Sequence, residues 1–150
     1  MLVEAQINIS GSKEAVWAVM TDIENAADIL SGVEKIEIVE RPVDGLVGMR
    51  WRETRMYFGS LATIEKQITD VVENEYYKTR AEDSGFVFLS TMSISKSGDS
   101  VTLTSSHDTQ PQGFVAKLKS APMIFFKGVI RKALQQDLND IKTAVEQNEQ

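Results

Sequence analysis

The chain has 150 residues, of which 42% are hydrophobic and 25% charged, and this is typical of a globular protein with a sizeable core. It contains no cysteine, so disulfides, thiolate catalysis and cysteine-ligated zinc are excluded. The net charge of −6 argues against nucleic acid and against an anionic membrane surface as partners, because both favour basic proteins.

The first part of the chain mixes strand and helix patterns. Residues 2–9 alternate apolar and polar side chains, which predicts a strand with one solvent-facing side. Ser12 fits the N-cap of a helix that follows this strand. The sequence Thr21-Asp22-Ile23-Glu24 is typical of a capping box and predicts a second short helix that ends near Leu30. Residues 33–40 alternate again, so we expect the second strand there.

Five further strand patterns follow, separated by short connections that contain glycine, asparagine or aspartate. They cover residues 48–59, 60–72, 76–82, 86–96 and 100–109. Because short connections join strands that are neighbours in space, these strands predict an antiparallel meander.

The last third of the chain changes to a helical period. Its apolar residues recur at intervals of four, four, four, three and four, at Phe126, Ile130, Leu134, Leu138, Ile141 and Val145. This spacing predicts one apolar stripe on a long helix. Pro122 either begins this helix or kinks a longer one that starts near Phe114.

The predicted order is β-αα-β6-α, in one α+β domain that spans residues 1–150. A seven-stranded antiparallel sheet and a long C-terminal helix must bury their apolar faces against each other. A twisted sheet that wraps around a straight helix leaves a space, which either is filled as core or remains as a mainly apolar cavity.

Two stretches carry a resemblance to a known family. Residues 7–40, INISGSKEAVWAVMTDIENAADILSGVEKIEIVE, run through a strand, a small-residue turn, a Val-Trp helix, a Thr-Asp pair, a second short helix and a strand. Residues 41–54, RPVDGLVGMRWRET, form a glycine-bearing hairpin before a strand. With the meander and the long helix, these features resemble the START-like, Bet v 1-like (SRPBCC) superfamily, in its polyketide cyclase/dehydrase and lipid-transport branch. The resemblance implies a helix-grip fold and a ligand such as a lipid, isoprenoid, quinone or polyketide, but no shared catalytic motif.

The strand over residues 48–59 carries charge on both of its faces. The face that continues Val47 and Met49 is expected to be the inner one, and it holds Trp51, Glu53, Arg55 and Tyr57. Buried charges need partners, and Lys66 on the next strand is the candidate partner of Glu53. The inner charges form either a polar cluster that orients a ligand's oxygen or a structural ion pair, unless a bulge turns one of them outward.

The only histidine, His107, shares its strand face with apolar residues such as Leu103. It is either a proton donor or acceptor in the cavity, or a strand-end histidine solvated near Asp108. One histidine without cysteine predicts no metal site, and no cofactor is expected. The other candidate ligand-binding residues are Phe88, Met92 and Leu103 on the strands, and Phe125, Phe126 and Val129 near the expected cavity entrance.

Three functions fit these expectations. The first is the binding or transport of a small hydrophobic molecule. The second is a cyclase or dehydratase, in which Glu53 or His107 acts as general acid or base while Arg55 or Tyr57 stabilises an enolate oxygen. The third is a structural domain with a filled core and no ligand.

Expectations about partners and location follow from the same patterns. No segment approaches the roughly 18 apolar residues of a membrane span, so we expect no membrane insertion. Residues 1–10 lack the pattern of a signal peptide, and we expect a cytoplasmic protein. Phe125 and Phe126 are adjacent and cannot point the same way, which leaves a homodimer contact open.

Overall fold

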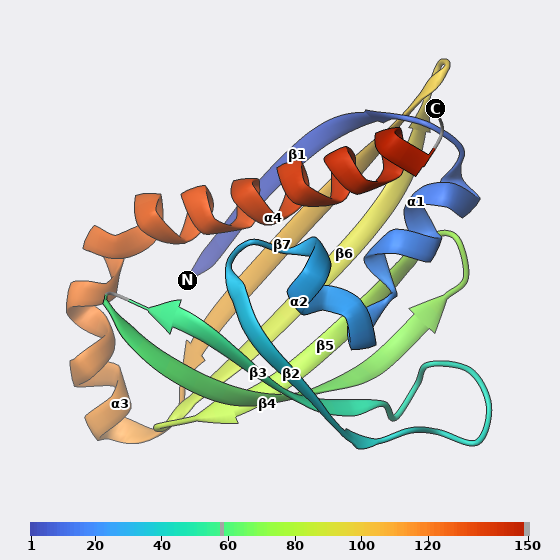
Figure 1. Ribbon diagram of the computed structural model, residues 1–150. Helices are drawn as coiled ribbons and strands as arrows, with labels where there is room; N and C mark the ends of the chain where they lie inside the picture. The colour runs from blue at the N-terminus through green and yellow to red at the C-terminus, as the bar shows by residue number, and fades with distance from the viewer. Residues whose placement is uncertain (58, 149–150) are drawn as a thin grey trace.

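The computed structural model describes residues 1–57 and 59–148, with the backbone alone for 115, 116, 119–121 and 123. The elements are, in chain order, β1 (Leu2–Ser10), α1 (Lys13–Met20), the 3-10 helix η1 (Ile23–Asn25), α2 (Ala26–Ile29), β2 (Val33–Glu40), β3 (Arg50–Tyr57), β4 (Ser60–Val72), β5 (Tyr76–Asp83), β6 (Phe86–Ser97), β7 (Ser100–Pro111), α3 (Gly113–Ser120), the 3-10 helix η2 (Ala121–Phe126) and α4 (Lys127–Asn148). The strands form one antiparallel sheet in the order β1-β7-β6-β5-β4-β3-β2 (Figure 1). The predicted meander is confirmed, with β1 added beside β7.

The sheet curves around α4 (Figure 1). Hydrogen bonds join this helix to both sides of the sheet. On the β1 side, Lys142 Nζ donates to the backbone oxygen of Asn8 at 2.7 Å. On the other side, Asp137 accepts from Arg55 of β3, and Asp140 accepts from the backbone N–H and the hydroxyl of Ser31 before β2. This arrangement is the helix-grip fold, as the sequence predicts.

The segment between β1 and β2 begins as expected but continues differently. Ser12 Oγ accepts from the backbone N–H of Ala15 at 3.1 Å, so it is the N-cap of α1. The predicted capping box at residues 21–24 is wrong. The Thr21 hydroxyl instead donates to the Trp17 carbonyl at 2.7 Å, at the end of α1, and neither η1 nor α2 has a side-chain cap. A Thr hydroxyl can bond back to the carbonyl four residues earlier in place of capping the helix that follows.

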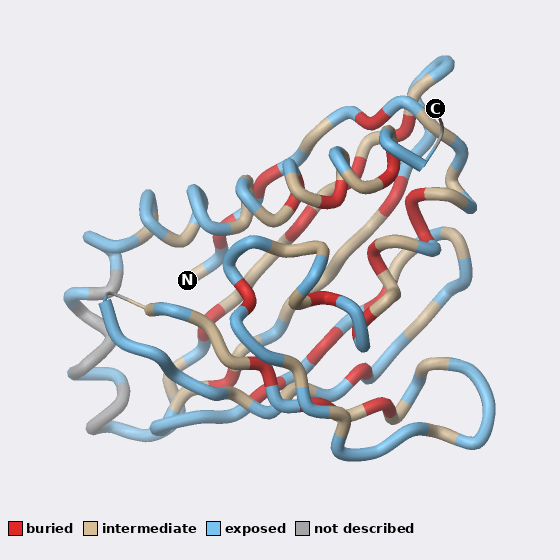
Figure 2. Tube along the Cα trace, in the orientation of Figure 1, coloured by how far each residue is buried: buried red, intermediate tan, exposed pale blue. Residues whose placement is uncertain are grey.

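The core lies between the concave face of the sheet, α1 and the C-terminal half of α4 (Figure 2). Ile9, Ile68, Leu103 and Leu138 are fully buried. Along α4 the predicted apolar stripe is buried at Leu138, Ile141 and Val145, because these positions face β1 and α1. Burial of this stripe on the sheet is the main contact that holds the helix in place.

The helical segment begins well before the apolar stripe. It runs from Gly113 through α3 and η2 into α4 and changes from α to 3-10 geometry around Pro122, so of the two alternatives the kinked longer helix is correct. Phe126 lies in η2 and is exposed, which means that the buried stripe does not extend to it. Among the described residues, no helix is long and apolar enough to cross a membrane.

Two irregularities set which side chains of β2 and β3 face the core. A shift of register between Val33 and Lys35 lets Val33 and then Ile36 point inward from the same strand. Gly48 has φ of +94°, a conformation that favours glycine, and it separates Val47 from β3. Val47 is therefore exposed in the loop, and using it as a sign of the inner face is wrong, whereas Met49 is buried as expected.

Candidate functional site

The inner face of β3 brings charged side chains into the concave side of the sheet. Opposite β3, Trp51 pairs with Lys66 and Glu53 pairs with Ile64 in the register of β4. Trp51 and Glu53 are only 3% and 5% exposed, and Arg55 and Tyr57 are half-buried. The alternation of β3 therefore places Trp51, Glu53, Arg55 and Tyr57 inward, and a one-residue slip would have turned all four outward.

A network of four charges connects β3, β4 and α4. Glu53 Oε2 accepts from Lys66 Nζ and from Arg55 Nε, each at 2.7 Å. Glu53 Oε1 accepts from the indole Nε1 of Trp51 at 3.3 Å. Arg55 also donates through Nη1 and Nη2 to the two carboxylate oxygens of Asp137, at 3.1 and 2.8 Å. Two cations and two anions thus satisfy one another, as burial requires.

These contacts fix the ionisation of the network. Burial alone would raise the pKa of Glu53, but the charges and hydrogen bonds of Lys66 and Arg55 outweigh it and lower the pKa to about 2. Burial would likewise lower the pKa of Arg55, but Glu53 and Asp137 raise it. At neutral pH Glu53 is an ionised acceptor that is already engaged by three donors. This geometry suits a structural network and disfavours proton transfer by Glu53.

A small pocket lies beside this network, on the inner face of β3 to β7. Its volume is about 90 Å³. It is lined by Tyr57, Ile64, Lys66, Thr79, Ala81, Phe88, Ser90 and His107. Lys66 is the single charged side chain of this described lining, since His107 is neutral at neutral pH. The pocket is therefore an apolar space with one cationic group and a few hydroxyls, a combination that can orient an oxygen-bearing molecule.

His107 forms one wall of the pocket. Its Nδ1 lies 3.0 Å from the hydroxyl of Ser90, and its ring stacks on Phe88 with centroids 5.9 Å apart. Burial, assisted by the nearby charge of Lys66, lowers the pKa of His107 to about 4. Burial also raises the pKa of Tyr57. The pocket therefore offers a neutral imidazole and a neutral phenol beside a protonated amine.

The candidate ligand-binding residues fall into three groups. Tyr57, Phe88 and His107 line the pocket. A second group lies on the inner face of the sheet but outside the lining, and consists of Trp51, Glu53, Arg55, Met92 and Leu103. The third group lies in η2 and at the start of α4, exposed and outside the lining: Phe125, Phe126 and Val129.

Sequence reasoning missed several lining residues. Ile64, Thr79, Ala81 and Ser90 were not among the candidates, and Lys66 was considered only as a partner of Glu53. Each lies on the inward face of its strand, so the alternation of residues along the strand indicates that its side chain points inward. The missing information is the register between strands, which places Thr79 opposite Ser90 and Ala81 opposite Phe88.

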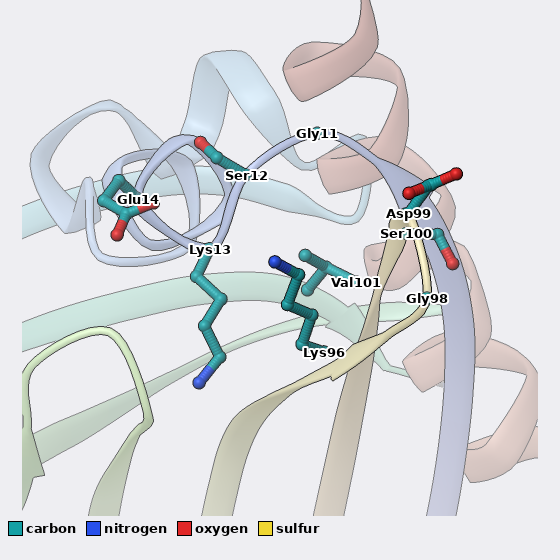
Figure 3. A pocket seen from close by; sticks show the side chains of 9 residues that line it. All are labelled: Gly11, Ser12, Lys13, Glu14, Lys96, Gly98, Asp99, Ser100 and Val101. Carbon is teal, nitrogen blue, oxygen red and sulfur yellow. The ribbon is translucent and has the colours of Figure 1, made fainter.

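A larger hollow of about 300 Å³ lies at the other end of the sheet, between the β1–α1 turn and the β6–β7 hairpin (Figure 3). Lys13 and Lys96 extend into the space below the turn, while Ser12 lies on the turn itself (Figure 3). Lys13 Nζ donates to Glu75 at 2.7 Å, and Ser12 caps α1. Because Lys13 and Ser12 already have protein partners and most of the lining residues are exposed, we interpret the hollow as a surface depression and take the smaller inner pocket as the candidate site.

The fold and the pocket define a class of protein: a curved antiparallel sheet, gripping a long helix, with a partly apolar cavity on its inner face. The family described as "Polyketide cyclase / dehydrase and lipid transport" matches residues 2–146. The chain therefore belongs to this family, as the pattern of its sequence indicates. No curated protein matches the chain.

Solved structures share the whole fold at low sequence identity. The Zhui aromatase/cyclase from Streptomyces sp. R1128 aligns with a TM-score of 0.78 and 20% identity, over 100% of this chain and 96% of that one. A START superfamily protein from Mycobacterium smegmatis aligns with a TM-score of 0.79 and 20% identity, over 97% of each chain. A point mutant of norcoclaurine synthase from Thalictrum flavum aligns with a TM-score of 0.74 and 18% identity, over 100% of this chain and 96% of that one. At these identities the similarity concerns the fold.

Proposed function

We propose that the protein binds a small, mainly hydrophobic molecule whose oxygen-bearing end enters the pocket beside Lys66. The observation that carries this proposal is the convergence of Lys66, Ser90 and His107 on a mainly apolar space. A carboxylate, enolate or carbonyl oxygen would accept from Lys66, which keeps donors beyond the one engaged by Glu53. The family's description, which includes lipid transport, is in keeping with such a ligand.

The size of the pocket limits how the ligand is held. A volume of about 90 Å³ is well below the roughly 300–1,000 Å³ of ordinary small-molecule sites. The pocket therefore accommodates the polar end of a ligand, or a single ring, and the apolar remainder extends along the concave face. Binding a larger molecule requires the elements that surround the pocket to move apart.

A dye-binding experiment tests this proposal. Anilinonaphthalene sulfonate combines an aromatic body with an anionic end, so its fluorescence should rise when it binds the wild-type protein. Ala81→Leu places a larger side chain in the pocket and should weaken dye binding about tenfold or more, because a displaced ring loses roughly 1.5 kcal/mol or more of burial. Ala18→Leu, on the exposed face of α1, is the matched control and should leave binding unchanged. Equal affinities for both variants would contradict the proposal.

A second variant tests the polar end separately. Lys66→Met removes the cation and should reduce affinity for the anionic dye more than affinity for an uncharged naphthalene analogue. Lys78→Met, on the outer face of β5, controls for the change in net charge. Native mass spectrometry of the purified protein adds a direct observation, since a co-purified molecule would appear as a mass difference from the denatured chain.

An acid–base enzyme is the second candidate function, and His107 is the residue that favours it. With a pKa of about 4, its imidazole is neutral at neutral pH and can accept a proton inside the pocket only as a weak base. Glu53 is less suited, because its carboxylate has a pKa of about 2 and already accepts three hydrogen bonds. His107→Gln should then abolish turnover of a model substrate while leaving dye binding within a few fold. Loss of binding together with turnover would favour a purely binding role for His107.

A further inference from the structure

Large apolar side chains are exposed together at one end of the molecule. They lie on α3, η2 and the first turn of α4, and η2 contacts both helices. We name them the end patch: Phe114, Leu118, Ile124, Phe125, Phe126 and Val129. Phe125 is 84% exposed and Phe114 75%. Single exposed apolar residues are ordinary, but a cluster on one short segment marks an interaction surface.

The same segment has an unusual charge. Residues 109–136 contain five lysines or arginines and no aspartate or glutamate, whereas the rest of the chain contains 11 basic and 22 acidic residues. Among the basic residues, Lys117, Arg131 and Lys132 are exposed. The overall charge of −6, which argued against an anionic membrane surface, therefore conceals a cationic, apolar segment.

We propose that the end patch docks the protein on the surface of an anionic lipid bilayer. In this arrangement, exposed phenylalanine and aliphatic side chains enter the boundary between headgroups and acyl chains. Arg131, Lys132 and their neighbours remain at the level of the lipid phosphates, each contributing attraction to a negative surface. Docking of this kind lies in the plane of the membrane and needs no spanning helix.

Charge complementarity favours a lipid surface over a second copy of the chain. A symmetric dimer brings the same patch of each subunit face to face. Here it would bring Arg131 and Lys132 of one copy toward the same residues of the other, and like charges brought together in an interface oppose association. An anionic bilayer supplies both the apolar layer that the phenylalanines need and the counter-charge that the basic residues need.

The end patch lies at the end of the sheet that also carries the pocket. The strand ends around Tyr57, Phe86 and Pro111 are all at this end, and α3 follows β7 directly beyond them (Figure 1). The hollow lined by Lys13 and Lys96 is at the opposite end (Figures 1 and 3). Docking would thus bring the pocket close to the bilayer, although the docking itself does not require the pocket to hold a ligand.

Vesicle flotation tests the proposal directly. The probes are phosphatidylcholine vesicles with and without a minor fraction of phosphatidylserine. Wild-type protein should float with the anionic vesicles, stay behind with the neutral ones and be released by high salt, because salt screens exposed charges. No flotation with either vesicle, or equal flotation with both, would overturn the proposal.

Paired variants assign the effect to the end patch. Arg131→Gln with Lys132→Gln should weaken binding to anionic vesicles roughly 30-fold, about fivefold for each removed charge. Lys78→Gln with Arg80→Gln changes the net charge equally on the outer face of β5 and should have little effect. Equal losses from the two pairs would mean that total charge, and not this segment, governs binding, and would refute the proposal.

The apolar contribution is tested in the same assay. Phe125→Ser should weaken binding about tenfold or more, since a largely exposed ring would no longer be buried in lipid. Val43→Ser, in the fully exposed loop before β3, is the control and should change nothing. Sedimentation velocity of the same variants tests the alternative that a second copy of the chain binds the end patch. If the wild type is a dimer that Phe125→Ser dissociates, and no vesicle is bound, the patch is a self-association surface and the proposal is wrong.

Discussion

Replacement of Glu53 by Gln gives the sharpest test of the charge network. The change removes one negative charge and leaves the cations of Lys66 and Arg55 half-buried beside a neutral amide. The folded protein lowers the pKa of Glu53 from 4.5 to about 2, and a shift of this size corresponds to roughly 3 kcal/mol of stability at neutral pH. Removal of one member of a buried ion pair costs a similar amount, roughly 3–5 kcal/mol.

The variant should therefore unfold at a markedly lower urea concentration. A loss of roughly 3 kcal/mol corresponds to a melting temperature lower by about 6–12 °C in a chain of this length. Trp51 donates to Glu53, so tryptophan fluorescence reports on this region during unfolding. Glu65→Gln is the matched control. Glu65 lies on the outer face of β4 in loose, exposed ion pairs with Arg50 and Arg52, and its loss should cost less than about 1 kcal/mol.

The pH dependence of the effect provides a second readout. Because the folded pKa of Glu53 is lower than the unfolded value, its contribution is complete above pH 4.5 and is lost as the pH falls toward about 2. The stability difference between wild type and Glu53→Gln should therefore shrink on acidification. A Glu53→Gln variant whose stability lies within about 1 kcal/mol of the wild type, the range expected for the Glu65→Gln control, would refute the conclusion that the network holds the sheet and helix together.

Three further outcomes follow from the structure. His107 has a folded pKa of about 4 against 6.5 for the free group, so the unfolded chain takes up the proton first and stability falls as the pH drops from about 6.5 to 4. His107→Phe should remove that dependence, and unchanged pH profiles would contradict the burial of the imidazole. Leu138→Ala creates a cavity at a fully buried site and should cost about 2–5 kcal/mol in urea unfolding, whereas Val129→Ala, at a half-exposed one, should stay within about 0.5 kcal/mol. Ser12→Ala removes the acceptor for the Ala15 N–H and should lower the free energy of unfolding by about 1 kcal/mol. The amide hydrogen of Ala15 should then exchange faster, and an unchanged rate would argue against the cap.

The fold could be predicted from the sequence because its signals are local. Alternation of apolar and polar residues identified the strands, and short turns between them implied that neighbours pair. The inner position of Glu53 was predicted from Val47 and Met49; Met49 and Trp51 on this face are buried, whereas Val47 is exposed in the preceding loop. Lys66 could be chosen as its partner because it occupies the inward face of the adjacent strand.

Other parts of the site depend on contacts that the sequence does not reveal. Asp137 pairs with Arg55 across 82 residues, and this pairing depends on how α4 crosses the sheet. The apolar spacing from Phe126 onward indicates a helix face but not how far that face is buried, and Phe126 is 43% exposed. The volume of the pocket likewise depends on strand register and side-chain packing, neither of which is a local property.

The pairing of β1 with β7 has a consequence for the order in which the protein folds. Leu2 lies opposite Asp108, and α4 packs on β1 from still further along the chain. Chains whose contacts join distant residues have a high contact order and fold slowly. During synthesis, at roughly 5–20 residues per second, β1 must wait several seconds for its partner, with Val3 and Ile9 uncovered. Although β1 precedes the other strands of the sheet in the chain, it is thus among the last to pair, and the sheet is complete only after β7 has been synthesised.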